Sequence, residues 1–322
     1  MKKIVPALCI MACVLTMLAG CAKPSEINKT DKISVVTTIF PEYDWTREIT
    51  KGNENIELTM LLDKGVDLHS FQPSADDIVK LSSCDVLIYV GGESDGWIDD
   101  ALAEAKNENM VTINLLNELG ENIKEEEIVQ GMESDEEVLE EDEAEYDEHV
   151  WLSLKNAKIL CKSIADCLSV ADPANKELYE NNLQGYISKL DALDKEYEAA
   201  VSNASVKIIL FGDRFPFRYM TDDYGLDYYA AFAGCSAESE ASFETITFLA
   251  QKADELNLSA IIQIDNADGK IAQTIKETTS NSNQQILTMN SMQSVTSADV
   301  ENNVTYLGIM QDNLSVLSQA VN

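Results

Sequence analysis

Short apolar, β-branched runs alternate with amphipathic helical patterns over the first part of the chain. We expect buried strands at residues 33–38, 56–61, 86–90 and 111–113. Helical patterns lie between these runs, near residues 42–51, 74–83 and 97–106. Strands separated by single helices of this length are typical of parallel βαβ units.

The same alternation returns in the second half of the chain. Here the apolar runs fall at residues 206–211, 226–229, 260–264 and 285–287. Two sets of four runs indicate two separate sheets more simply than one sheet of eight strands. The pattern therefore predicts an α/β fold with two βα lobes, each containing a mainly parallel four-stranded sheet.

The segment between the two sets, residues 173–203, has the pattern of one long helix. Its apolar side chains recur at helical spacing, at Leu183, Ile187, Leu190, Leu193 and Tyr197. At 1.5 Å per residue, about thirty residues span on the order of 45 Å, enough to tie two lobes together rigidly. We therefore expect an N-terminal lobe at 32–172, a linking helix at 173–203 and a C-terminal lobe at 204–322.

The N-terminus has the pattern of a lipoprotein export signal. Lys2 and Lys3 precede a short apolar stretch, residues 4–17, and small residues lead into Cys21. We expect cleavage after residue 20, a diacylglycerol on the Cys21 thiol and a lipidated tether over residues 21–31. This predicts a protein anchored to the extracytoplasmic face of the cell membrane. The alternative is an ordinary secretory signal with an incidental cysteine.

The formal charge is −34 at pH 7, with 57 acidic and 23 basic residues, which argues against nucleic acid as a partner. Acidic residues concentrate in an insertion at 118–148. Self-repulsion should keep this insertion open and mobile. It is either a solvated surface loop or a loop that gathers cations, because it ends directly at His149.

Four cysteines remain once those of the signal segment are set aside. They are scattered, without the Cys-x-x-Cys pairing of zinc ribbons, at Cys84, Cys161, Cys167 and Cys235. We expect small buried apolar residues or one optional disulfide.

The chain has only two histidines, His69 and His149, and each lies beside acidic residues. A neutral imidazole is the commonest protein ligand for transition metals, and a nearby carboxylate can hold its other ring nitrogen. Either histidine alone could equally be a surface or core residue. Their surroundings must therefore decide.

Those surroundings match a known family. The chain resembles the zinc- and manganese-binding lipoproteins of ABC transporters, the cluster A-I solute-binding proteins, over essentially its whole mature length. The tracts that carry the resemblance are Val35-Val36-Thr37-Thr38-Ile39-Phe40-Pro41, Asp67-Leu68-His69-Ser70-Phe71-Gln72-Pro73-Ser74 and Asp147-Glu148-His149-Val150-Trp151. The resemblance implies a monomer that holds a metal ion between two lobes and delivers it to a membrane permease and its ATPase. It also implies that His69 and His149 are metal ligands.

The remaining two ligands are less clear from the resemblance. The family's third ligand falls at or next to Arg214, whose guanidinium offers no lone pair, so we expect Asp213 in its place. Asp213 could instead pair with a neighbouring arginine or cap a turn. The fourth ligand is expected at Asp265, with Asp268 in reserve, although either acid could simply cap the following helix.

Two imidazoles and two carboxylates suit Zn²⁺, and also Mn²⁺ with a larger coordination number. We expect Zn²⁺ as the transported ion, because the inherent affinity order and the acidic insertion both favour it. A metal-dependent hydrolase is an alternative, but the His-Glu-x-x-His and glycine-rich phosphate motifs are absent from the sequence. A surface adhesin would leave the two histidine tracts unexplained.

Overall fold

The N-terminal half is built on a parallel sheet with strand order β2-β1-β3-β4. The computed structural model describes residues 32–133, 145–236 and 240–322. The strands follow the apolar runs: β1 (Ile33–Thr37), β2 (Ile56–Met60), β3 (Val86–Tyr89) and β4 (Val111–Asn114). Every residue of the central strand β3 is buried, as expected for a strand covered on both faces.

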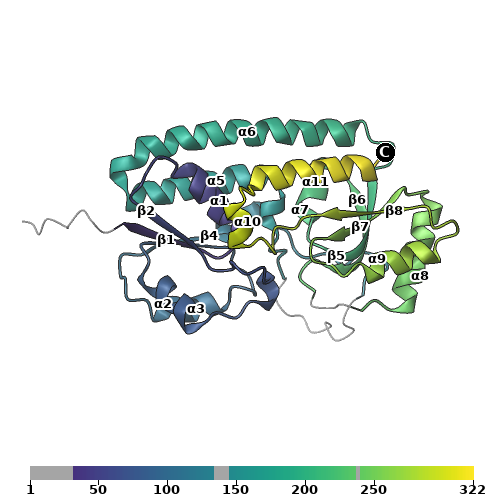
Figure 1. Ribbon diagram of the computed structural model, residues 1–322, viewed down its shortest axis with the longest axis horizontal. Coiled ribbons are helices and arrows are strands. Elements are labelled where there is room, and N and C mark those ends of the chain that lie inside the picture. The colour runs from purple at the N-terminus through teal and green to yellow at the C-terminus, as the bar shows by residue number, and fades with distance from the viewer. Residues whose placement is uncertain (1–31, 134–144, 237–239) are drawn as a thin grey trace, which may run out of the picture. The chain divides into compact units, whose positions relative to one another are not determined.

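Helices cover both faces of this sheet (Figure 1). On one side lie α2 (Ala75–Ser83) and α3 (Trp97–Ala103), and on the other lie α1 (Phe40–Ile49) and α5 (Leu154–Ala171). A short helix, α4 (Leu115–Leu119), follows β4 directly. The three predicted helices of this half begin within two residues of their expected positions.

The C-terminal half repeats the plan, with four parallel strands in the order β6-β5-β7-β8. The strands are β5 (Ile208–Phe215), β6 (Asp227–Ala233), β7 (Ala260–Ile264) and β8 (Gln285–Met289). The helices are α7 (Arg218–Tyr224), α8 (Phe243–Glu255), α9 (Lys270–Thr278), α10 (Ser297–Glu301) and α11 (Tyr306–Ala320). The expected α/β fold with two four-stranded parallel sheets is therefore confirmed.

The long helix α6 (Lys176–Ser202) has 27 residues and follows a 3-10 turn at Pro173–Asn175. It packs against α1 and α5 of the first half and against α7 and α11 of the second. Most of the predicted apolar positions are buried, whereas Ile187 is only partly covered. The Tyr197 hydroxyl also donates to the Met310 carbonyl at 2.7 Å, which attaches α6 to α11.

One hydrophobic core contains residues from both halves. The rings of Trp45 in α1 and Tyr306 in α11 meet edge to face, with centroids 5.1 Å apart. The Tyr306 amide donates to Asp44 at 2.7 Å, and its hydroxyl donates to the Trp151 carbonyl at 2.7 Å. The start of α11 therefore fastens the second half to the first.

The acidic insertion differs from the expected open loop at its two described ends, 118–133 and 145–148. Glu125 and Tyr146 form an antiparallel bridge, and the Lys124 amide donates to the Tyr219 hydroxyl at 3.0 Å. Arg218 donates to the Glu125 carbonyl at 3.0 Å and pairs with Glu127. Cations and hydroxyls of the second half therefore offset the repulsion that the sequence predicts; residues 134–144 lie outside the described part.

The four cysteines at positions 84, 161, 167 and 235 are all free, and the first three are buried. The optional disulfide is therefore not formed in this structure. Within the described ranges, no helix combines the length and apolar character needed to cross a membrane.

Candidate metal centre

His69 lies on a 3-10 turn, Leu68–Ser70, between β2 and α2. Asp67 caps this turn, because its Oδ1 accepts from the His69 amide at 3.0 Å. Leu68 is buried in the core, and its packing there fixes the turn. The imidazole of His69 points into the junction of the two halves. The His69 side chain is 9% exposed.

His149 lies at the start of a second 3-10 turn, Val150–Leu152, and is fully buried. A single oxygen, Asp147 Oδ1, accepts from the His149 amide at 2.8 Å and lies 3.0 Å from His149 Nδ1. Such a carboxylate fixes the tautomer and orientation of a ligating histidine. Next along the turn, the Trp151 indole donates to the Ser291 carbonyl of the second half at 2.9 Å, which fixes the turn against that lobe.

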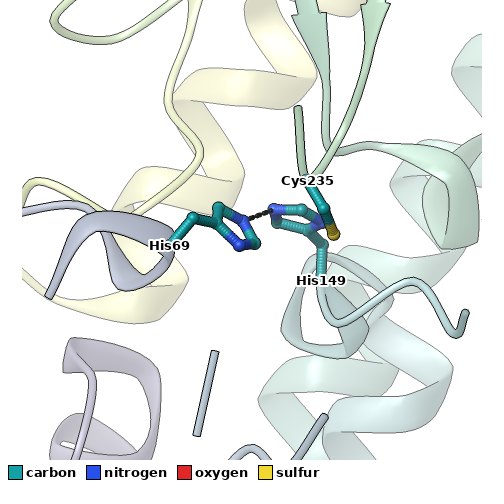
Figure 2. Close-up of side chains that lie close together, drawn as sticks. All are labelled: His69, His149 and Cys235. Carbon is teal, nitrogen blue, oxygen red and sulfur yellow. Dashed lines mark hydrogen bonds between the residues drawn. The ribbon is translucent and has the colours of Figure 1, made fainter. Parts of the chain in front are cut away.

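The two imidazoles face each other, with their Nε2 atoms 3.1 Å apart and joined by a hydrogen bond (Figure 2). Two nitrogens bound to one tetrahedral zinc lie roughly 3.3 Å apart, given zinc–nitrogen bonds of about 2.0–2.1 Å. His69 Nδ1 lies 2.8 Å from the Ser94 hydroxyl, which can donate or accept. A cation can therefore take the place of the proton shared by the two Nε2 atoms with little movement of either ring.

The protonation state of His69 also suits a ligand. Burial, followed by the neighbouring His149, lowers the pKa of His69 to about 3. Its imidazole is therefore neutral at pH 7 and has a lone pair to offer. The Glu148 carboxylate lies 3.6 Å from His69 Nδ1, and burial raises the pKa of this carboxyl above its usual range.

Cys235 is the third potential ligand that the fold brings to this point. Its Sγ and one nitrogen of each imidazole all lie within 4.8 Å of one another. Among the described residues, this is the one group of three or more His, Cys, Asp or Glu side chains close enough to share an ion. Sequence reasoning placed Cys235 among the small apolar residues and missed it. Its position two residues after the end of β6 was the available signal, because loops at the carboxyl ends of parallel strands form binding sites.

Asp213 and Asp265, the carboxylates expected as third and fourth ligands, line a cavity of about 510 Å³ together with His69. Asp213 accepts from the Arg214 and Ile264 amides, at 2.8 and 3.2 Å. Asp265 accepts from the Ser291 amide at 2.5 Å and from the Ser294 hydroxyl. Neither belongs to the close group of the two histidines and Cys235, so both stay predictions.

The reserve candidate Asp268 is exposed and caps α9, where it accepts from the Lys270 amide at 3.0 Å. Arg214, at the family's usual third-ligand position, turns its guanidinium to Asp67, at 2.7 Å. Burial raises the pKa of Asp67, but the facing Arg214 and His69 outweigh it and the net pKa is lowered. The ion pair of Arg214 and Asp67 therefore occupies this wall of the cavity.

A second cavity, of about 550 Å³, is also lined by His69. Cys235 lies in its wall, and its acidic lining consists of Glu93, Glu126, Glu145 and Glu148. Glu148 is 3% exposed, and its Oε2 has no hydrogen-bond partner. This side of the site is therefore strongly negative and suits the passage of a cation.

Two parallel α/β lobes tied by a long helix, with a largely buried histidine pair at their junction, define a solute-binding protein for a metal ion. The family model described as "Zinc-uptake complex component A periplasmic" matches residues 35–320. The chain belongs to this family. Its members are solute-binding proteins and not enzymes, which rules against the hydrolase alternative.

Relatives with zinc-related names align over almost the whole chain. The high-affinity zinc uptake system protein ZnuA of Bacillus subtilis (strain 168) is 29% identical over 97% of this chain and 96% of its own length. The zinc-binding lipoprotein AdcA of Streptococcus pneumoniae serotype 4 is 28% identical over 99% of this chain. The chain spans 61% of the length of that relative.

Solved structures agree with the fold. The Zn(II)-bound ZnuA-like domain of Streptococcus pneumoniae AdcA has a TM-score of 0.70 and 26% identity, covering 90% of this chain and 99% of that one. The metal-dependent lipoprotein YcdH of Bacillus subtilis has a TM-score of 0.73 and 26% identity, with the same coverage.

Proposed function

We propose that this protein captures Zn²⁺ at the extracytoplasmic face of the membrane and delivers it to the permease of an ABC transporter and its ATPase. The observation that carries the proposal is the buried pair of Nε2 atoms, 3.1 Å apart, at the junction of the lobes. Nitrogen donors at this spacing match one small divalent ion. Because family members take up zinc, the transported ion enters as cargo and leaves again, so the site must release it.

Zinc fits this donor set better than manganese. Imidazole suits zinc, whereas manganese prefers carboxylates, carbonyls and water. Two imidazoles held by Asp147 and Ser94 therefore favour zinc, and Mn²⁺ is the alternative cargo. Asp213 and Asp265 stay candidates for the remaining positions, and both accept hydrogen bonds from backbone amides in this structure.

We propose further that the mature chain begins at Cys21, carries its lipid there and works as a monomer. The proposed division is a signal at 1–20, a tether at 21–31, an N-terminal lobe at 32–172 with the insertion 118–148, a linking helix at 173–203 and a C-terminal lobe at 204–322. The permease would read a small rotation of the lobes, because α6 packs on both and resists a wide hinge.

The proposal is tested by calorimetric titration of the purified full chain, in detergent, with Zn²⁺ and then with Mn²⁺. We expect tight one-to-one zinc binding, weaker manganese binding, and loss of tight binding in the His69→Ala and His149→Ala variants. The exposed variant Lys162→Ala is the matched control, and thermal unfolding in chelator shows whether each variant is folded. Tight zinc binding that survives both histidine substitutions would refute the site, and a wild-type chain without tight binding would refute the function.

A further inference from the structure

Cys235 follows the end of β6 through a turn that touches His149. A Cβ atom placed on Gly234 would lie 3.1 Å from both Cε1 and Nδ1 of His149 and 3.0 Å from the Phe215 carbonyl. A side chain here would crowd the ring by a few tenths of an ångström, so glycine suits this close approach of the backbone. The next residue is Cys235, whose side chain lies next to the histidine pair in Figure 2.

The distances suit zinc with a modest adjustment. A sulfur and a nitrogen bound to one tetrahedral zinc lie roughly 3.6 Å apart, given bonds of about 2.3 and 2.0–2.1 Å. The Cys235 sulfur and the two imidazole nitrogens already lie within 4.8 Å of one another. The sulfur therefore has to move by roughly 1 Å, which rotation of its side chain and a small lobe movement can supply. The Cys235 amide donates to Glu126 Oε1 at 2.8 Å and keeps the backbone in place.

The competing candidates are engaged elsewhere. Asp213 is held by two backbone amides, and Arg214 is paired with Asp67. Moving the Asp213 carboxylate toward the histidines would weaken its hydrogen bond from the Ile264 amide, which costs free energy. The Cys235 sulfur makes a hydrogen bond with the Glu148 backbone, which favours its thiolate form. It also lines the acidic cavity, which gives a cation access to it.

We propose that Cys235 is the third metal ligand of this chain, bound as a thiolate beside His69 and His149. This inference rests on the proposed zinc-binding function. On binding, the thiol loses its proton to solvent and a zinc–sulfur bond forms, with no change of oxidation state. A thiolate ligand favours zinc over manganese, because manganese prefers oxygen donors. The Cys235 ligand therefore makes the site more selective for zinc than a carboxylate in its place would.

Cobalt replaces zinc as the probe, because a cobalt–thiolate bond gives an intense near-ultraviolet charge-transfer absorption. The full chain in detergent is titrated with Co²⁺ as wild type, Cys235→Ser, Cys84→Ser and Asp213→Asn. We expect the absorption in all of these except Cys235→Ser. The Cys84 control suits this purpose, because its thiol donates to the Leu81 carbonyl and a serine hydroxyl can do the same.

Zinc affinity is measured on the same variants. We expect Cys235→Ser to weaken binding roughly 100-fold or more, since losing a ligand costs more than the 10–100-fold typical of outer-shell partners. A wild-type chain that binds zinc tightly without the cobalt–thiolate absorption would overturn the Cys235 inference and leave the function intact. A wild-type chain that binds neither ion would instead overturn the function.

If the Cys235→Ser variant does not fold, a measurement on the wild-type chain tests the inference instead. Alkylation of the thiols is followed by peptide mass mapping, with and without zinc. We expect zinc to slow modification of Cys235 and to leave the buried Cys161 and Cys167 unchanged. Equal modification of Cys235 in both conditions would overturn the inference.

Discussion

The Asp147 carboxylate is expected to set the zinc affinity of His149 without touching the ion. Asp147 Oδ1 serves both the amide and Nδ1 of His149, at 2.8 and 3.0 Å. The substitution Asp147→Asn keeps an oxygen that accepts both hydrogen bonds and removes only the negative charge. The variant therefore isolates the electrostatic part of the interaction from its geometric part.

The size of the effect follows from the geometry. A divalent ion on His149 Nε2 would lie roughly 6 Å from the Asp147 oxygen, adding the ring to a metal–nitrogen bond of about 2.1 Å. Removing one charge at that distance costs about 1.4 kcal/mol at a dielectric constant of 80 and about 5.5 kcal/mol at 20. Outer-shell partners of ligating histidines contribute 10–100-fold in affinity, or about 1.4–2.7 kcal/mol. We expect Asp147→Asn to fall in this lower range.

Competition between the protein and a zinc chelator of known affinity measures this change. The matched control is Asp172→Asn, a buried aspartate whose Oδ2 accepts from Asn53, Asn175 and Tyr179. We expect the control to keep wild-type zinc affinity. A folded Asp147→Asn chain with unchanged affinity would refute the role of the carboxylate, and equal loss in both variants would point to a general loss of structure.

Three further predictions concern stability. Burial raises the pKa of Asp95 to about 7, so the folded state holds this proton more tightly. Its contribution to stability is fully present below the unfolded pKa of about 3.9 and falls by about 1.4 kcal/mol per pH unit up to the folded pKa. In urea unfolding from about pH 5 to about pH 7, the free energy of unfolding should therefore decline less steeply in Asp95→Asn than in the wild type. An equal slope in the two proteins would contradict this. Gly92→Ala should lose about 1–3 kcal/mol, because φ is +81° and the new Cβ would lie 2.3 Å from Glu148 Oε1; an unchanged melting temperature would show that the loop adapts freely. Leu190→Ala should lower the free energy of unfolding in urea by about 2–5 kcal/mol, because loss of this fully buried side chain of α6 leaves a cavity. The exposed control Gln184→Ala should change it by no more than about 0.5 kcal/mol. Equal effects of the two substitutions would argue against the packing of α6.

The sequence by itself determined the architecture. Strand and helix signals are local and periodic, so the eight apolar runs and the Leu183 to Tyr197 spacing were enough to predict two parallel sheets and one long helix. Element ends were harder to predict: β5 runs on to Phe215 beyond its apolar run, because Arg214 and Phe215 pair with β6 after an irregularity that contains Asp213. The two histidine tracts stood out because each contains its own local acid, Asp67 or Asp147, whose carboxylate accepts from the amide of the histidine.

The tertiary structure decided what surrounds the histidines. Cys235 lies 86 positions after His149, and its place just after an apolar run does not show that its sulfur meets two imidazoles. The sequence left open which groups Asp213 and Asp265 contact, and the structure shows that backbone amides from another strand and a loop donate to them. The ends of the acidic insertion likewise pack because Tyr219 and Arg218 of the second half meet them. Local pattern fixes each element, whereas the partners of a polar side chain depend on which distant loops the two sheets bring together.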